Sequence, residues 1–334
     1  MTDAAIAGAA VSHRRILRVA LPIVLSNATV PILGIVDTGV VGQLGEAAPI
    51  GAVGIGAIIL TTVYWAFGFL RMGTTGLVGQ ALGARDAAEV SALLTRALMI
   101  AVAAGVTLIA LQSLVFAGAF RISPASAEVE GLARQYMAIR IWSAPAAIAI
   151  YGLTGWLIAQ ERTRAVLVLQ VAMNGLNIGL DLVFVLGLGW GVEGVATATF
   201  LAEWSGAALG LWLCRDAFAM PSWRDWPRVF DRDRLAHMAS VNTDILIRSL
   251  LLQAVFVSFL FYGADFGDVT LAANQVLLQF LQVTAFAMDG FAFAAEALVA
   301  QALGARRRDL LRLSAVRSSQ WGMGAGLLLA VAFA

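Results

Sequence analysis

Apolar stretches of about 20 residues or more recur along the chain, and short polar or charged segments separate them. A helix needs about 20 mainly apolar residues to cross the hydrocarbon core of a bilayer. The stretches lie at about residues 19–42, 50–82, 97–117, 137–159, 166–188, 192–214, 245–263 and 270–303. This pattern predicts an all-α polytopic membrane protein with eight full spans.

A further apolar run begins near Ser319, and the printed sequence ends at Ala334 inside it. We therefore expect part of a ninth span and a chain that is truncated at its C-terminus. One interpretation that follows is an inactive fragment, which inserts into the membrane without transporting anything. A natural truncation and a partial sequence both fit the pattern.

Composition supports the membrane assignment and excludes several classes of chemistry. Hydrophobic residues make up 60% of the chain and charged residues 13%, against about 45–50% and about 25% in soluble domains. One cysteine and two histidines are too few for a disulfide framework or a Cys/His zinc site. The chain has no lysine and no phosphate-binding GxxxxGK[ST] loop. We expect no ATP, no nucleic acid and no resident cofactor.

All 22 basic residues are arginine, and their distribution predicts the orientation. With the N-terminus in the cytoplasm, seventeen arginines fall in cytoplasmic loops and two, Arg121 and Arg134, in the opposite loops. Basic residues in short loops stay on the cytoplasmic side. We expect a multi-pass protein of the bacterial inner membrane, with a linker at about residues 215–240 lying at the cytoplasmic headgroup interface.

The chain contains two copies of one unit. Residues 78–85 read VGQALGAR and residues 299–306 read VAQALGAR, a match at seven of eight positions. Six spans separate these equivalent points, which predicts a parallel repeat with its axis along the membrane normal. The predicted parts are an N-terminal six-span lobe at 1–214, the linker at 215–240 and a partial C-terminal lobe at 241–334.

Four features together resemble the multidrug and toxic compound extrusion (MATE) transporters, and look closest to their DinF-like branch. They are Pro22 with Asp37 in the first span, the QALGAR motif with its twin, the run NGLNIGLDLVF from Asn174, and DGFAFAAEALVAQALGA from Asp289. The resemblance implies a fold of two six-helix lobes. It also implies a non-enzymatic export mechanism of alternating access in a monomeric full-length protein, in which amphiphilic or cationic compounds leave as protons or sodium ions enter.

Polar side chains occur within the first, fifth and sixth spans, where an ionisable group is costly and is a functional candidate. Counting along each span places Asp37, Asp181, Thr199 and Glu203 in the outer half of the membrane. Asn177 and Asn174 lie one and two helical turns from Asp181 on the same face. The pattern places no basic residue near the two aspartates. Burial and a second carboxylate both favour the protonated form of an acid, so this pair suits a coupling proton.

The MATE resemblance points to the same residues. It implies that Asp37, Asn177, Asp181 and Thr199 bind the coupling proton or sodium ion, that Tyr136 belongs to the same site, and that Pro22 bends the first span. Carboxylate and amide oxygens serve both ions, so both remain as coupling ions. The alternative for Asn174 and Thr199 is a purely structural role, in which their hydrogen bonds join neighbouring helices.

Asp289 and Glu296 lie seven residues apart, on one face of the eighth span. That span holds no basic residue to neutralise them, so we expect them to line a polar cavity or to face partners on the spans that follow. Two rival functions also remain. A lipid-linked precursor flippase would use Arg71 and Arg140 to bind pyrophosphate, and an intramembrane enzyme would need a catalytic group that the sequence does not otherwise offer.

Overall fold

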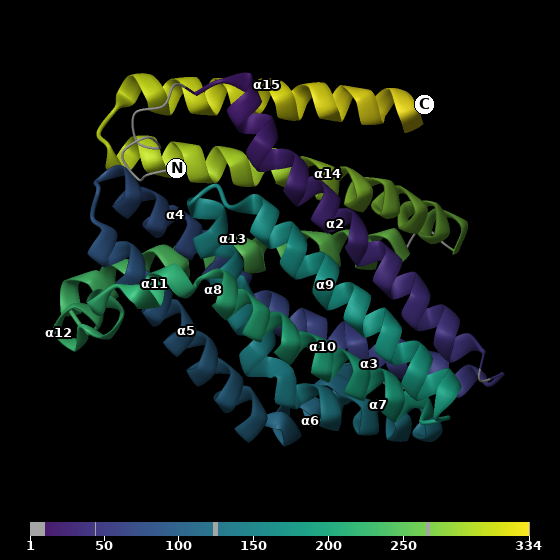
Figure 1. Cartoon of the computed structure of the whole chain (residues 1–334). Coiled ribbons are helices and arrows are strands. Elements are labelled where there is room, and N and C mark those ends of the chain that lie inside the picture. Colours follow the sequence, from purple (N-terminus) through teal and green to yellow (C-terminus); the bar gives the residue numbers. More distant parts are fainter. Residues whose placement is uncertain (1–10, 44, 123–125, 265–267, 334) are drawn as a thin grey trace.

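The computed structural model describes residues 11–43, 45–122, 126–264 and 268–333, and the secondary structure in these ranges is helical, as predicted (Figure 1). The α-helices are α2 (His13–Gly42), α3 (Ala47–Trp65), α4 (Phe69–Gly83), α5 (Ala87–Ala110), α6 (Gln112–Ile122), α7 (Ala127–Arg140), α8 (Ala144–Ala159), α9 (Thr163–Asp181), α10 (Gly191–Leu213), α11 (Arg215–Ala219), α12 (Trp226–Val229), α13 (Arg232–Ala264), α14 (Asp268–Gly304) and α15 (Arg308–Phe333). Short 3-10 helices η1 (Ala66–Gly68), η2 (Ile141–Ser143) and η4 (Pro221–Arg224) and a π-helix η3 (Leu182–Gly187) complete them.

Seven of the helical stretches in the described chain are long and apolar enough to cross a membrane, and they match seven of the eight predicted spans. The eighth, predicted at 192–214, corresponds to α10, which is 23 residues long and packs against α9, α7 and α8. It carries two acidic residues, Glu193 and Glu203. The predicted linker also ends early, since α13 begins at Arg232.

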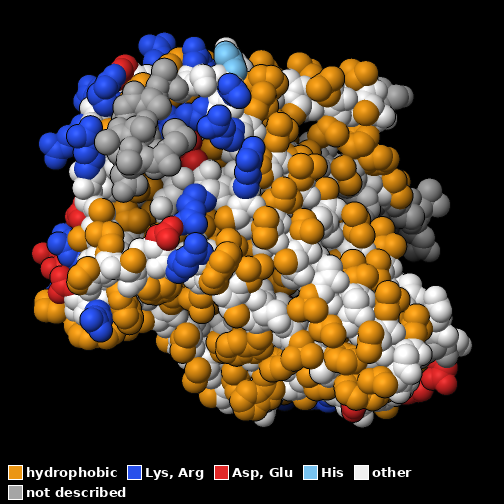
Figure 2. Space-filling model, viewed as in Figure 1, with side chains coloured by type: hydrophobic (Ala, Val, Ile, Leu, Met, Phe, Trp, Pro, Cys, Tyr) orange, Lys and Arg blue, Asp and Glu red, His pale blue; other side chains and the backbone are white. Residues whose placement is uncertain are grey.

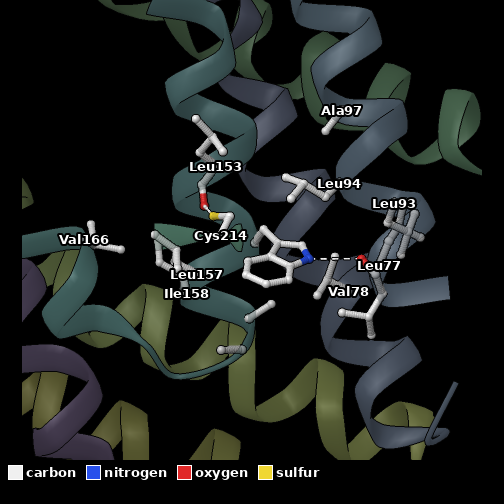
Figure 3. Close-up of a cluster of buried hydrophobic side chains, with 14 of the residues drawn as sticks. Leu77, Val78, Leu93, Leu94, Ala97, Leu153, Leu157, Ile158, Val166 and Cys214 are labelled. Atoms are coloured by element: carbon white, nitrogen blue, oxygen red, sulfur yellow. Dashed lines mark hydrogen bonds between the residues drawn. The ribbon is translucent and has the colours of Figure 1, made fainter. Parts of the chain in front are cut away.

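The long helices lie side by side in one bundle, in which α14 packs against α2, α4 and α15 (Figure 1). The larger of two buried apolar clusters joins residues from both halves of the chain. Figure 3 shows part of it, where Leu94 of α5 and Leu153 and Leu157 of α8 gather around a buried indole. The indole belongs to Trp156, whose Nε1 donates to the carbonyl oxygen of Val90 at 3.0 Å.

Arginine side chains gather at one end of the bundle, at the upper left of Figure 2, and hydrophobic side chains cover most of the remaining face. We call this the arginine-rich end. Buried polar contacts join three segments there: Arg15 at the start of α2 pairs with Glu161 at 2.5 Å and donates to Gln301 of α14 at 3.0 Å. Gln301 in turn donates to the carbonyl oxygen of Ala159 at 2.8 Å. These contacts hold the start of α2, the end of α8 and the end of α14 together.

The twin QALGAR motifs meet each other at the arginine-rich end. A Cβ at Gly83 would lie 2.0 Å from the carbonyl oxygen of Gln301, and a Cβ at Gly304 would lie 1.9 Å from that of Gln80. Only glycine permits two backbones to approach so closely. The contact is reciprocal, as a twofold relation between the two copies requires.

Each motif also ends in the same turn. Arg85 and Arg306 both adopt left-handed backbone, with φ of 61° and 56°. The N–H groups of these arginines bond to the carbonyl oxygens of Leu82 and Leu303, each at 3.0 Å. The sequence repeat is therefore also a repeat of backbone conformation.

Candidate functional site

Asp37 of α2 and Asp181 of α9 come together inside the bundle. Their carboxyl groups interact with each other, and a proton on either one would let them share a hydrogen bond. Asn177 Nδ2 donates to Asp181 Oδ2 at 2.8 Å, and both of these residues are buried. Oδ1 of each aspartate is also buried and has no hydrogen-bond partner among the described residues. The pair therefore presents unsatisfied acceptor oxygens in an enclosed place.

The local helix geometry places these groups. Asn177 and Asp181 are four residues apart, so the amide and the carboxyl stack on one face of α9. The α-helix ends at Asp181 and continues as the π-helix η3. A π-turn inserts extra chain into a helix and is frequent at functional sites. Asp181 thus occupies a break in regular backbone that faces α2.

Asn174 and Thr199, which were also predicted at the site, form their hydrogen bonds with groups other than the two aspartates. Asn174 Nδ2 donates to Thr29 Oγ1 of α2 at 2.7 Å, which joins α9 to α2 about two turns away from the aspartate pair. Thr199 is buried in α10, and its hydroxyl donates to the carbonyl oxygen of Val195 at 3.0 Å. No hydrogen bond of the described residues joins Thr199 to Asp37 or Asp181.

A basic residue does lie near the aspartates, and the expectation that none would is wrong. Arg140 at the end of α7 interacts electrostatically with both Asp37 and Asp181. Its Nη1 donates to Tyr136 Oη at 2.9 Å, and its Nη2 donates to Glu203 Oε1 of α10 at 2.8 Å. Tyr136, predicted at the site, is buried beside Asp37 and interacts with it electrostatically.

Glu203 neutralises the charge of Arg140 and also has a structural role. Besides the ion pair, its Oε2 accepts a short hydrogen bond from Ser143 Oγ. The only sign of this ion pair in the sequence was an arginine in the fourth predicted span and a glutamate in the sixth, at similar depth. A buried ion pair of this kind is strongly destabilised when one partner is removed.

The charges of the site sum to a net negative value. The Arg140–Glu203 pair is neutral, so the aspartate pair carries a single negative charge when one of its two carboxyl groups is protonated. In a medium of low dielectric constant such a charge attracts a cation strongly. A second proton, or a monovalent cation bound by carboxylate and amide oxygens, would neutralise it.

Asp289 and Glu296 form a second group on α14, and their partner is Arg71 of α4. Arg71 interacts electrostatically with both acids, and its guanidinium lies 3.7 Å from the ring centroid of Phe293. A positive charge near both acids is therefore present within the described chain, in its N-terminal half. The group lies between α4 and α14, where the two halves pack.

The predicted hinge has a partner on a neighbouring helix. Pro22 is buried within α2, and proline removes the hydrogen bond to the carbonyl four residues earlier. That carbonyl belongs to Arg18, and it accepts a hydrogen bond from Thr163 Oγ1 at 3.3 Å. The start of α9 thus satisfies the group that Pro22 leaves free.

Comparison with known proteins decides the family. The family model MatE matches residues 22–183 and 245–334. The chain belongs to the MATE family. The MATE-family chain is 38% identical over 296 residues to DNA damage-inducible protein F of Escherichia coli (strain K12), covering 88% of this chain and 64% of that protein. This likeness confirms the predicted DinF-like resemblance.

More distant MATE relatives match a similar share of the chain at lower identity. Identity is 28% to Protein DETOXIFICATION 44, chloroplastic, of Arabidopsis thaliana, over 85% of this chain and 56% of that protein. It is 25% to a NorM of Synechococcus sp., named there as a multidrug resistance protein, over 91% and 68%. The chain thus spans somewhat less than two thirds of the first two relatives that it matches.

Solved structures confirm the fold. A MATE crystal structure in complex with MaD3S superimposes with a TM-score of 0.87 at 22% identity, covering 100% of this chain and 75% of that one. An outward-facing multidrug resistance MATE transporter gives a TM-score of 0.84 at 21% identity, over 96% and 71%. At these identities the likeness shows the fold alone.

Proposed function

We propose that this protein is a secondary antiporter that exports amphiphilic or cationic compounds, driven by the inward flow of protons or sodium ions. The observation that carries the proposal is the buried Asp37–Asp181 pair with Asn177 beside it. Membership of the MATE family and the multidrug names of its relatives support the same function. No cofactor or ATP enters the mechanism.

The ion acts by changing the charge between α2 and α9. When the site takes up a second proton or a sodium ion, the repulsion between the two carboxylates disappears and the helices can approach. When the ion leaves, the charge returns and draws in water. Pro22 leaves the carbonyl group of Arg18 without its helical partner and Thr163 supplies one, so α2 can bend at Pro22 without leaving this carbonyl unsatisfied. Alternating access follows if these two arrangements open different ends of the bundle.

The flippase alternative loses its main support. It requires arginines free to bind a pyrophosphate, whereas Arg140 is paired with Glu203 and Arg71 is held between Phe293 and two acids. Each guanidinium lies among acidic side chains, which repel an anionic substrate. An organic cation is the better match to the acidic groups of the bundle interior.

Efflux measurements test this function. In cells that lack other pumps and express the full-length gene product, efflux of a cationic dye should slow when the proton or sodium gradient is collapsed. Depleting ATP while the gradient is maintained should leave the rate unchanged. Efflux that persists without either gradient and follows ATP would contradict the antiport mechanism.

The proposed orientation places the arginine-rich end in the cytoplasm, in a bacterial inner membrane. A cysteine that replaces exposed Glu46 should react with a membrane-impermeant maleimide in intact cells, and one that replaces exposed Arg164 should react only after permeabilisation. The native Cys214 is buried, so background labelling should be low. The reverse pattern would show that the arginine-rich end faces outward.

A further inference from the structure

An apolar groove of about 550 Å³ lies on the outer face of α5, close to the arginine-rich end. Leu98, Met99, Val102 and Val106 of α5 form its floor, and Phe218 of α11 and Trp223 of η4 form one end. Met99, Val102 and Val106 are exposed. Because α5 is one of the helices fit to cross a membrane, this face lies against lipid in the inserted protein.

The linker that closes the groove is firmly held in place. Buried hydroxyl groups of α5 donate to its backbone carbonyl oxygens, Ser91 Oγ to Ala217 at 2.6 Å and Thr95 Oγ1 to Trp223 at 2.8 Å. The rings of Phe218 and Trp223 pack edge to face with centroids 5.7 Å apart. The end of the groove is therefore a preformed aromatic wall rather than a loose loop.

The linker carries both the composition and the exposure of a segment at the membrane interface. Trp226 and Phe230 are stacked, with ring centroids 5.9 Å apart, and both are more than half exposed. Tryptophan is enriched at the level of the lipid headgroups, where one part of the ring is dry and its N–H is wet. The groove thus runs from hydrocarbon depth to the headgroup layer.

Arg224 is one of the linker arginines whose charge is not neutralised by an acidic side chain of the described residues. Arg228 and Arg234 of the linker form ion pairs with Asp86 and Glu89. Arg224 takes part in none of the ion pairs of the described residues, is exposed, and lies 5.9 Å from the ring centroid of Trp223. A positive charge therefore stands beside the aromatic end of an apolar groove.

We propose that this groove binds an anionic phospholipid, with one acyl chain along α5 and the headgroup phosphate on Arg224. The apolar floor matches an acyl chain, and the unpaired guanidinium matches a phosphate, to which arginine binds in a planar, two-pronged geometry. The bound lipid would fix the linker that connects the two halves of the chain. This site is separate from the Asp37–Asp181 pair and does not depend on which compound is transported.

Lipid binding to the purified protein tests the proposal. Native mass spectrometry of delipidated protein should detect phosphatidylglycerol retained at one-to-one stoichiometry, and phosphatidylcholine retained more weakly. Arg224→Gln should weaken retention of phosphatidylglycerol by about fivefold, the effect of one arginine near an anionic surface. Ala103→Trp, which fills the groove, should reduce binding of both lipids.

Matched controls separate the site from general attraction. Arg215→Gln removes another linker arginine with no ion pair, one that stacks on Trp212 at 4.4 Å, and should leave retention unchanged. Glycerol phosphate, which has the headgroup without acyl chains, should not be retained. Equal losses in Arg215→Gln and Arg224→Gln, equal retention of the two lipids, or retention of glycerol phosphate would each overturn the proposal. Unfolding temperatures in phosphatidylcholine nanodiscs check that every variant is folded. Dye efflux plays no part in this test, so its outcome is independent of the proposed antiport.

Discussion

An Asp181→Asn variant should lose ion-driven efflux by at least about tenfold, the range expected for a coupling free energy of about 1.4 kcal/mol or more. The asparagine amide has nearly the shape of the carboxyl group, and its oxygen still accepts the hydrogen bond from Asn177 Nδ2. Its amide group donates to Asp37 in place of the shared proton. The asparagine amide and the Asp37 carboxylate then form their hydrogen bonds without exchanging a proton or cation, so folding survives while coupling is lost. Dye efflux in cells, with the amount of membrane-inserted protein measured in parallel, gives the result.

Asp37→Asn should behave in the same way, since the pair shares one proton and works as a unit. Asp244→Asn is the matched control, because it removes an exposed acid from α13 and leaves the pair intact. Efflux at the wild-type rate in both Asp37→Asn and Asp181→Asn would remove these residues from the coupling mechanism. An equal loss in Asp244→Asn would point to a general effect of removing acidic residues.

Gly83→Ala and Gly304→Ala should destabilise the protein by at least about 1–3 kcal/mol, the usual cost of overpacking. The new methyl groups would meet backbone oxygens of Gln301 and Gln80 at 2.0 and 1.9 Å, and backbone has no rotamer with which to move away. The helices α4 and α14 would have to separate at the arginine-rich end. Thermal unfolding of the purified protein measures the loss.

Gly76→Ala is the control on the same helix. A Cβ at Gly76 meets nothing within 4 Å, and alanine favours a helix more than glycine does. Its unfolding temperature should stay the same or rise. A drop equal to that of Gly83→Ala would mean that the glycines matter for flexibility along α4 rather than for the contact with α14.

The sequence predicted the parts of the site that depend on helical periodicity. Asn177 and Asp181 are neighbours because they are four residues apart, and that spacing fixes a shared face wherever α9 packs. The repeat was visible for a similar reason, since identical letters at a constant offset adopt the same turn. The depth of Asp37 and Asp181 was predicted by counting residues along two spans of predicted direction.

Contacts between helices were the part that periodicity did not reveal. Arg140 reaches Glu203 across the gap between α7 and α10, and Arg71 reaches Glu296 from α4 to α14. Such pairs depend on which helices are neighbours and on how each is rotated about its axis, which hydrophobic length does not specify. Counting basic residues only within the same span therefore missed both arginines. The aspartate pair was predicted from depth and residue type, and its charge balance emerged only with Arg140 in place.

The reciprocal contact of the twin turns has a consequence for how the two halves can change. Each motif supplies a glycine and a carbonyl group, and the glycine of one motif packs against the carbonyl group of the other. The surface of a single motif is therefore complementary to a second copy of the same surface. Two identical chains, each bearing a single motif, could meet through the same surface about a true twofold axis, as isologous dimers do. In a fused chain that surface is paired within one molecule. A substitution of the glycine in one motif must then be accommodated by the carbonyl group of the other motif. The two motifs therefore constrain each other's sequence, while the rest of each half can diverge.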